Sequence, residues 1–414
     1  MRFLKEIFGG FNRILRTIYN TTLAFLRRII PAPGKKYLRG VLYRFKNRIL
    51  IKNQGELRQI LAENQAGNEN RTIVIFPPAL EFQVLLFQRP MQLALALAKK
   101  GALVFYIQPQ PDRKQRPFQL ISERLYVCPI EMDTFRIISN AVIYLVTWNS
   151  DRAAWFDQPR ILYDYIDDIK VFFGDYDANA KGHRFLLQNA SYVLATARRL
   201  LDEVRQQRPE AIYSPNAVVY EHFSRAARRE YTSPPDDLLP ILSKSKPVIG
   251  YYGALARWFD YSLLNAIATL RPEYQFVLIG PDFDGTILTS EVVKSGNIHW
   301  LGPKLHGELP HYLQYFDVAM IPFMVNEITH ATSPIKLFEY MAAEKPVVIT
   351  PMQESMHYPG VLVGGSALQF AQQLDCALQK CTDRDYLDLL RKTALENTWE
   401  RRAEEILSVI ENTR

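Results

Sequence analysis

Cysteines, long apolar runs and leader-like features are scarce or missing in this sequence of 414 residues. Its three cysteines, Cys128, Cys376 and Cys381, form no CxxC pair and no cluster with histidine at zinc-binding spacing. Neither a disulfide framework nor a zinc site is therefore expected, and the thiols should be reduced. No uncharged apolar run reaches the roughly 18 residues of a spanning helix, and Arg13 and Arg16 interrupt the stretch that a signal peptide would keep apolar. These absences favour a cytoplasmic location.

Three motifs that mark common enzyme classes are also missing. The sequence contains no GxGxxG turn and no Walker loop, which weakens dehydrogenase and kinase interpretations. It has no GxSxG motif, which weakens a hydrolase interpretation.

Acidic side chains are rare in the first fifty residues, where Glu6 stands against twelve Lys or Arg, a formal charge of +11. The other 364 residues carry 38 basic and 42 acidic side chains. At 100° per residue, apolar and basic side chains of residues 2–30 fall on opposite sides of a helix, which is typical of interfacial helices. Residues 1–48 are therefore predicted to bind an anionic membrane surface, with Pro31 and Pro33 ending the helix. The alternatives are packing on the protein's own body and nucleic-acid binding, which no reader motif supports.

The remainder of the chain alternates short β-branched or aromatic runs with helical patterns, which predicts parallel sheets covered on both faces. Two such series, separated by a polar stretch, predict an α/β protein with two doubly wound domains facing a cleft, where ligands are expected to bind. The expected strands are 72–76, 103–108, 142–147, 161–165, 192–196, 248–252, 276–279, 298–301, 318–322 and 347–350. The expected parts are a basic arm (1–50), an N-terminal domain (51–225), a linker (226–246), a C-terminal domain (247–395) and a closing helix (396–414).

Residues 321–350 are the most informative stretch, with the sequence IPFMVNEITHATSPIKLFEYMAAEKPVVIT. A buried strand leads into a polar loop, and a helix is predicted to begin at Ser333 and Pro334, since Ser is a preferred N-cap and Pro fits the first turn. Free N–H groups at a helix start make an anion site, to which Lys336 could add a full charge. Glu339 follows one turn later, within reach of a hydroxylated group beside that anion. A phosphate next to a sugar fits this arrangement, and the alternative is a capped helix with a solvated Glu339.

This stretch resembles the donor-binding segment of GT-B glycosyltransferases. It is most similar to bacterial group 1 (family 4-like) members of the teichuronic-acid type, which carry NELTxATSPxKLFEYLAAGKPVV. Five further segments resemble parts of that fold in the same order: FQRPMQLALALAKKG (87–101), ILYDYIDDI (161–169), YSPNAVVYEHF (213–223), VIGYYGALARWFDYSLL (248–264) and ENTWERRAEEIL (396–407). The resemblance implies two Rossmann-like domains and a nucleotide-diphospho sugar bound by the C-terminal one.

The resemblance also implies roles for individual residues. In such enzymes the helix start holds the diphosphate and the residue in the position of Glu339 binds the ribose hydroxyls. The donor-binding candidates are Gly253, Arg257, Asn326, Thr332, Ser333, Pro334, Lys336 and Glu339. Gln88 and Arg89 are expected on the acceptor side.

Four positions depart from the family pattern. The first Glu of the retaining pair is replaced by Ala331, and Glu327 is the candidate for the missing carboxylate. Ala217 and Val219 stand in NAVV where NGVD is usual, and Glu344 replaces the glycine that normally ends the helix.

Three carboxylates, Asp164, Asp167 and Asp168, follow an expected strand. Crowded carboxylates can raise one pKa and create a base, so Asp167 or Asp168 is the candidate that orients or deprotonates the acceptor. DxD triplets occur at residues 175–177 and 282–284, but neither lies in the single-domain context in which GT-A enzymes bind a metal. Asp260 is expected to cap a helix.

The sequence thus predicts a metal-independent, cofactor-free glycosyltransferase that uses a nucleotide-diphospho sugar. Its acceptor is expected to be lipid-linked, at the inner face of the cell membrane, in cell-surface polysaccharide or glycolipid synthesis. Two alternatives stay open: a nucleotide-sugar epimerase on the same fold, and a non-catalytic membrane-bound scaffold.

Overall fold

The computed structural model describes residues 32–65, 71–82, 87–171 and 176–413. The amphipathic helix expected before Pro31 therefore lies outside the described residues. From Ala32 the described chain forms the 34-residue helix α2 (Ala32–Gln65), so Pro33 lies in the first turn of this helix. The ring is tolerated there because the first turn has no intrahelical acceptor for the missing N–H. The limit expected at residue 50 falls inside α2.

The rest of the described chain contains two sheets, and we call the parts around them the first lobe (71–217 and 399–413) and the second lobe (218–396). The first-lobe sheet has the strand order β3-β4-β2-β1-β5-β6-β7-β8, and only β3 runs antiparallel to its neighbour. Its strands are β1 (Ile73–Phe76), β2 (Leu103–Ile107), β3 (Gln119–Ser122), β4 (Leu125–Cys128), β5 (Val142–Leu145), β6 (Arg160–Tyr165), β7 (Tyr192–Ala195) and β8 (Ile212–Tyr213).

The second-lobe sheet is parallel throughout, in the order β11-β10-β9-β12-β13-β14. This order reverses direction beside the first strand, as in dinucleotide-binding folds, and so creates a crevice at the carboxyl ends of β9 and β12. Its strands are β9 (Val248–Tyr252), β10 (Gln275–Ile279), β11 (Ile298–Trp300), β12 (Val318–Ile321), β13 (Val347–Ile349) and β14 (Val361–Val363).

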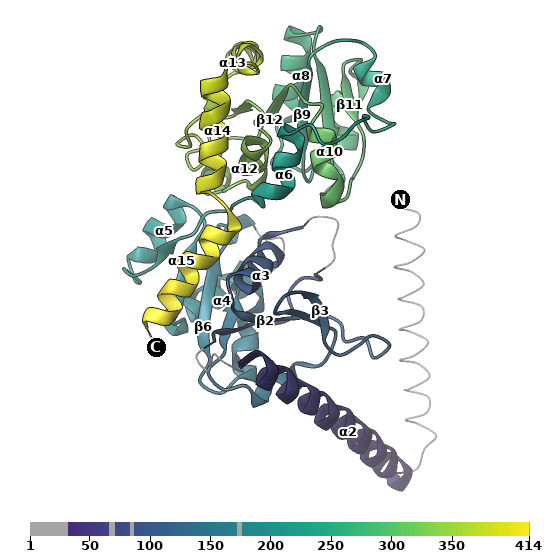
Figure 1. Ribbon diagram of the computed structural model, residues 1–414, viewed down its shortest axis with the longest axis vertical. Coiled ribbons are helices and arrows are strands. Elements are labelled where there is room, and N and C mark those ends of the chain that lie inside the picture. The colour runs from purple at the N-terminus through teal and green to yellow at the C-terminus, as the bar shows by residue number, and fades with distance from the viewer. Residues whose placement is uncertain (1–31, 66–70, 83–86, 172–175, 414) are drawn as a thin grey trace. The chain divides into compact units, whose positions relative to one another are not determined.

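Helices cover the sheets, as Figure 1 shows. The α-helices after α2 are α3 (Arg89–Lys99), α4 (Tyr176–Asn189), α5 (Arg198–Arg205), α6 (Tyr220–Ala227), α7 (Leu239–Leu242), α8 (Tyr261–Leu270), α9 (Thr286–Thr289), α10 (Leu309–Leu313), α11 (Glu327–His330), α12 (Ile335–Ala342), α13 (Ala367–Lys380), α14 (Arg384–Glu396) and α15 (Trp399–Asn412). The 3-10 helices are η1 (Met132–Ile137), η2 (Thr147–Trp155), η3 (Ile169–Val171), η4 (Glu291–Lys294) and η5 (His306–Glu308). Within the described ranges, no helix combines the length and the apolar run needed to cross a bilayer.

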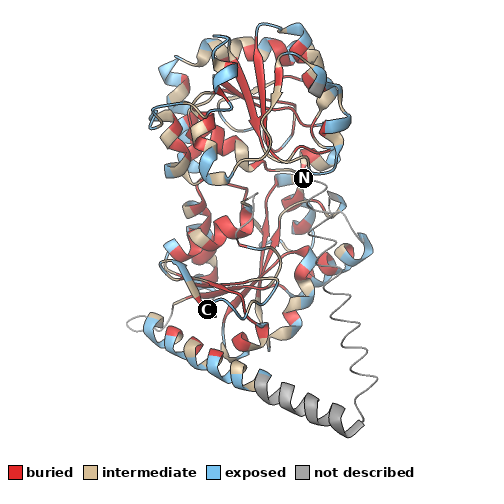
Figure 2. Ribbon diagram, turned by 90° about the vertical axis from the view of Figure 1, so that its right-hand side faces the viewer, coloured by how far each residue is buried: buried red, intermediate tan, exposed pale blue. Residues whose placement is uncertain are grey.

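Each lobe has its own apolar core, and the strands are its most buried part (Figure 2). All ten expected strands are present, because strands covered on both faces are continuous apolar runs. The C-terminal helix α15 returns to the first lobe, where it lies beside α3 (Figure 1) and buries Trp399, Ile406 and Ile410 in that core. The chain passes between the lobes twice, and the two passages pair at Val218 and Thr398.

Candidate functional site

Two adjoining cavities lie where the second-lobe crevice faces the first lobe. The one that we call the Glu339 cavity has a volume of about 190 Å³, and the one that we call the Asp167 cavity has about 340 Å³. Gln88, Ala254, Ile335 and Lys336 line both of them. The Asp167 cavity takes its walls from both lobes, so a ligand that filled it would be held between them.

Helix α12 opens onto both cavities, but it begins one residue later than expected. Pro334 precedes it with extended backbone angles, and Ser333 is not its cap. The reason is a tertiary contact: Ser333 Oγ accepts a hydrogen bond from Asn216 N at 3.2 Å, and its carbonyl oxygen accepts one from Asn216 Nδ2 at 2.5 Å. Ser333 therefore joins the lobes, and the first N–H groups of α12 keep no intrahelical partner, which makes this end electropositive.

Lys336 brings a cation to this helix start. Its Nζ lies 5.4 Å from the ring centre of Tyr251 and 5.1 Å from that of Phe323. Burial lowers the pKa of Lys336 to about 8, against the opposing effect of Glu339. The ammonium is therefore still largely protonated at neutral pH, in a position where an anion would restore the solvation that burial removed.

Glu339 lies one turn further along the same face of α12 and is 4% exposed. His306 approaches it, with 3.6 Å between His306 Nε2 and Glu339 Oε1, and the His306 ring stacks on His222. His306 and Glu339 are both among the residues that line the Glu339 cavity. The motif comparison did not single out His306, because it follows strand β11 in a stretch with no distinctive pattern.

Gly253 and Gly280 line the Glu339 cavity beside Lys336. Gly253 has φ +139°, and a Cβ there would lie 2.8 Å from Lys336 Cε. At Gly280 (φ +150°) a Cβ would lie 1.8 Å from the carbonyl oxygen of Gly253. Only glycine allows this backbone path and leaves room for a ligand beside Lys336.

Arg89 reaches the Asp167 cavity, yet its guanidinium is already bound within the first lobe. It donates from Nε to Asp164 at 2.7 Å and from Nη2 to the same carboxylate at 3.0 Å, and both side chains are at most 2% exposed. Further donations reach Ser214 Oγ and Asn216 Oδ1. Arg89 thus positions Asn216, which in turn holds Ser333, while Gln88 lines both cavities.

The structure separates the two candidate aspartates. Asp167 lines the Asp167 cavity, whereas Asp168 is buried and its Oδ1 accepts from Lys170 N at 2.9 Å, so it caps η3. Burial and the carboxylates of Asp164 and Asp168 raise the pKa of Asp167 to about 7, despite the opposing charge of Arg89. A carboxyl group that titrates near neutrality in a cavity is suited to proton transfer.

Glu327, the candidate for the missing carboxylate, does not line either cavity. Its side chain is exposed and pairs with Arg199 Nη2 at 3.1 Å and Lys170 Nζ at 3.7 Å. The hydrogen bond from Arg199 holds the pKa of Glu327 below its usual range. Both partners belong to the first lobe, so Glu327 is part of a second contact between the lobes.

The other loop candidates differ in their proximity to the cavities. Asn326 caps α11 through bonds from Ile328 N and Thr329 N to its Oδ1, while Thr332 and Pro334 line the Asp167 cavity. Arg257 is exposed and lines neither cavity; its N–H donates to Asp284 Oδ2 at 3.0 Å.

Three of the residues that depart from the family pattern, Ala217, Val219 and Glu344, differ in the backbone conformation they adopt. Neither Ala217 nor Val219 has a positive φ, so the backbone does not require the usual glycine there. Glu344, by contrast, has φ +53° at the end of α12, which is the conformation that glycine normally supplies. Asp260 caps α8 as expected, accepting from Leu263 N at 2.8 Å.

Comparisons with known proteins agree with this geometry. Residues 246–380 match the family model of Glycosyl transferases group 1. Over 190 residues the chain is 29% identical to the putative teichuronic acid biosynthesis glycosyltransferase TuaH of Bacillus subtilis (strain 168). The aligned residues make up 44% of this chain and 46% of TuaH. The chain thus spans about half the length of the curated relative that it matches.

Solved structures with low sequence identity share the fold. Sucrose-phosphate synthase from Thermosynechococcus elongatus has a TM-score of 0.63 at 14% identity, over 83% of this chain and 99% of that one. Anabaena HepE in complex with UDP-glucose has a TM-score of 0.60 at 14% identity, over 83% and 100%. These findings agree with the resemblance seen in residues 321–350: the chain has the GT-B fold, and its residues 246–380 match the group 1 family model.

Proposed function

We propose that the protein is a glycosyltransferase that moves a glycosyl unit from a nucleotide-diphospho sugar to a hydroxyl acceptor. One observation carries the proposal: the open N-terminus of α12, the Lys336 ammonium and the Glu339 carboxylate all face one cavity. An anion site with a hydroxyl-binding carboxylate one turn away is what a ribose diphosphate requires. The likeness to HepE, which was solved with UDP-glucose, supports the same ligand class.

In this proposal the diphosphate lies beside Gly253 and Lys336, which both line the Glu339 cavity, and the ribose hydroxyls donate to Glu339. The sugar then extends into the Asp167 cavity, which adjoins the Glu339 cavity through Gln88 and Ile335. Lys336 and the helix end supply the positive charge that offsets the leaving diphosphate, and we propose that the reaction needs no metal ion.

Asp167 is the group that we assign to the acceptor. The acceptor oxygen forms a bond to the anomeric carbon, the bond from that carbon to the diphosphate oxygen breaks, and the electron pair leaves with the diphosphate. The acceptor's proton passes to Asp167, whose raised pKa makes the carboxylate a competent base once it is ionised.

We further propose a lipid-linked acceptor at the inner face of the cell membrane, in the synthesis of a surface polysaccharide or glycolipid. The +11 charge of residues 1–50 and the similarity to TuaH support this placement. Flotation with anionic liposomes tests it: the full chain should float, and a chain without residues 1–48 should stay in the dense fraction. Flotation of the truncated chain would contradict the membrane assignment.

A donor panel tests the activity. The full-length protein is incubated with UDP-, GDP- and dTDP-sugars, with and without membrane lipid extract, and release of nucleoside diphosphate and labelled glycolipid is measured. Acceptor-dependent release supports transfer. Interconversion of the sugar without acceptor would indicate the epimerase, and no nucleotide binding at all would indicate the scaffold.

A further inference from the structure

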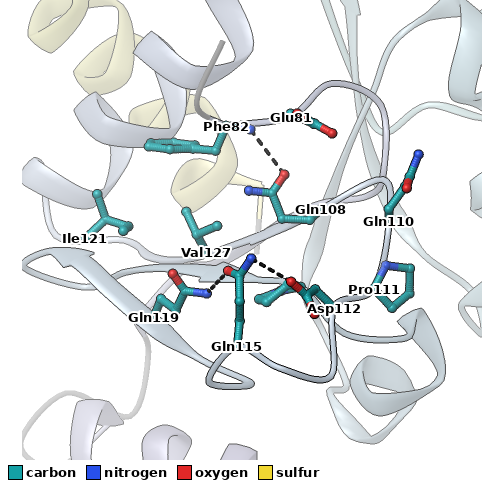
Figure 3. Close-up of a pocket in the computed structure, with 11 residues that line it drawn as sticks. Glu81, Phe82, Gln108, Gln110, Pro111, Asp112, Gln115, Gln119, Ile121 and Val127 are labelled. Atoms are coloured by element: carbon teal, nitrogen blue, oxygen red, sulfur yellow. Dashed lines mark hydrogen bonds between the residues drawn. The ribbon is translucent and has the colours of Figure 1, made fainter. Parts of the chain in front are cut away.

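A third cavity, of about 450 Å³, lies in the first lobe and shares no lining residue with the two cavities described above (Figure 3). It opens at the carboxyl ends of β1, β2 and β4, where Phe82, Gln108 and Pro129 line it, and β3 contributes Gln119 and Ile121. Its volume is within the range of small-molecule sites. We call it the glutamine cavity.

Amide side chains dominate its polar lining: Gln108, Gln110, Gln115 and Gln119. Gln119 Nε2 donates to Gln115 Oε1 at 2.7 Å, and Gln115 Nε2 donates to Asp112 Oδ2 at 3.0 Å. Figure 3 shows this chain on one side of the cavity and Glu81, Phe82 and Gln108 on the other. These hydrogen bonds orient the amides of Gln115 and Gln119 before any ligand arrives, which lowers the entropic cost of binding.

The same network leaves both donors and acceptors available. Gln108 Oε1 accepts from Phe82 N at 3.2 Å, so its amide N–H groups are not engaged by another described residue. At the end of the chain, Gln119 Oε1 accepts no hydrogen bond within the described ranges. A ligand that both donates and accepts hydrogen bonds at closely spaced positions would satisfy these groups, and a vicinal diol does so.

The charge of the lining selects among such ligands. Its ionisable side chains are the carboxylates Glu81 and Asp112, and no Lys or Arg is among the described residues that line it. A phosphate or uronate would therefore meet repulsion, whereas neutral hydroxyl groups can donate to both carboxylates. Nor do the described residues contain a group of three metal-ligating side chains.

Apolar surface completes the site. Phe82, Val127 and Ile121 line the cavity, and Ile121 is 41% exposed. Saccharides present apolar C–H faces as well as hydroxyl groups, and these faces gain by covering such surface. We propose that the glutamine cavity binds a neutral saccharide.

The position of the cavity indicates where this saccharide comes from. The Phe82 ring lies 6.0 Å from that of Phe87, centre to centre, and Phe87 lines the Glu339 cavity. The cavity also lies at the strand ends of the sheet whose strand β6 leads to Asp167. We therefore assign the saccharide to a neutral glycan portion of the acceptor, an assignment that, unlike the binding itself, rests on the proposed function.

Saturation-transfer NMR and calorimetry on the full-length protein test the binding. The probes are glucose, galactose, N-acetylglucosamine, cellobiose, lactose and chitobiose, with glucuronic acid as the charged counterpart. At least one neutral saccharide should bind, and glucuronic acid should bind roughly tenfold or more weakly than glucose, because its carboxylate meets Glu81 and Asp112. Stronger binding of glucuronic acid, or no binding of any neutral probe, would overturn the proposal.

Two variants localise the site. Gln119→Leu and Gln110→Leu should each weaken saccharide binding about fivefold or more by removing one hydrogen-bonding side chain. Gln372→Leu, at an exposed position of α13, is the matched control and should bind like the wild type. Equal affinity in all three variants would place the saccharide elsewhere and refute the assignment. Unchanged melting temperatures show that the variants are folded.

Parallel titration with UDP separates this proposal from the proposed function. A protein that binds UDP but no neutral saccharide contradicts the glutamine cavity alone. A protein that binds saccharides but no nucleoside diphosphate contradicts the transferase alone. If both bind, Gln119→Leu should raise KM for a glycan acceptor and leave KM for the donor unchanged; a raised donor KM would contradict the acceptor assignment.

Discussion

Replacing Lys336 by methionine removes the full positive charge that this side chain brings to the start of α12. Methionine keeps a similar length and an apolar stem, and its thioether can pack against the rings of Tyr251 and Phe323 in place of the ammonium. The expected result is a protein that folds normally and binds nucleoside diphosphates weakly.

The size of the loss follows from the contacts. A hydrogen bond between charged groups contributes about 1.5–3 kcal/mol, which corresponds to roughly a 10- to 150-fold increase in Kd. The N-terminus of α12 remains in the variant and retains about 0.3–1 kcal/mol of anion stabilisation, so binding should be weakened and not abolished. Stability should not fall, because burial already disfavours the charged form of Lys336, as its lowered pKa shows.

The pH dependence gives a second signature. In the free protein Lys336 loses its proton as the pH rises through about 8. Phosphate groups are already ionised there, so UDP affinity of the wild type should decline above pH 8. The Lys336→Met variant has no such proton to lose, and its weaker affinity should stay flat over the same range.

Calorimetric titration with UDP, GDP and ADP measures both effects, and Lys345→Met is a matched control. Burial lowers the pKa of Lys345 to about 8 as well, but its Nζ donates to the carbonyl oxygen of Gln314, and it lines neither cavity. Lys345→Met should therefore bind nucleotides like the wild type. If Lys336→Met bound them within twofold of the wild type, the assignment of the diphosphate to α12 would be wrong.

Asp167→Asn should lower kcat/KM by about 10²- to 10⁴-fold and remove the rise in rate that the wild type shows as Asp167 ionises near pH 7; a variant with an unchanged pH–rate profile would exclude Asp167 as the base. Asp164→Ala leaves the buried guanidinium of Arg89 without its carboxylate and should lower the free energy of unfolding by about 3–5 kcal/mol in urea titration. A loss below about 1 kcal/mol would show that other acceptors suffice for Arg89. Glu344→Gly relieves a positive φ and should raise the free energy of unfolding by about 1 kcal/mol. The loss of the exposed hydrogen bond between Arg391 and Glu344 reduces this gain. A lower melting temperature would contradict the prediction.

The strands were predictable where the sequence is locally unambiguous. Those covered by helices on both faces are short apolar runs, and β9 begins and ends at the expected residues. The β3–β4 hairpin was missed because β3 is only partly buried and does not alternate apolar and polar residues. Strand β8 has two residues, too few for any pattern, and all three residues of β14 are only partly buried.

The candidate site was predictable where it depends on one helix. Lys336 and Glu339 are three residues apart in the helix that was expected, so their common face follows from the helical period. The predicted N-cap of α12 was wrong. Ser333 is a residue type that favours the N-cap position, but its Oγ accepts a hydrogen bond from Asn216, which is distant in the sequence. An N-cap preference reflects only the local sequence, and a tertiary hydrogen bond can override it.

By itself, the sequence determined the α/β class, the separation of a basic segment from an acidic body, and the spacing of Lys336 and Glu339. These properties depend on composition and on local periodicity, which need no knowledge of distant contacts. The tertiary structure alone decided that Asp167 faces a cavity while Asp168 caps η3, that Arg89 is held by Asp164, and that glutamines from β3 and from the segment between β2 and β3 line one cavity. Burial and charge environment arise from segments far apart in the chain, and they decide which of several equivalent side chains can bind or react.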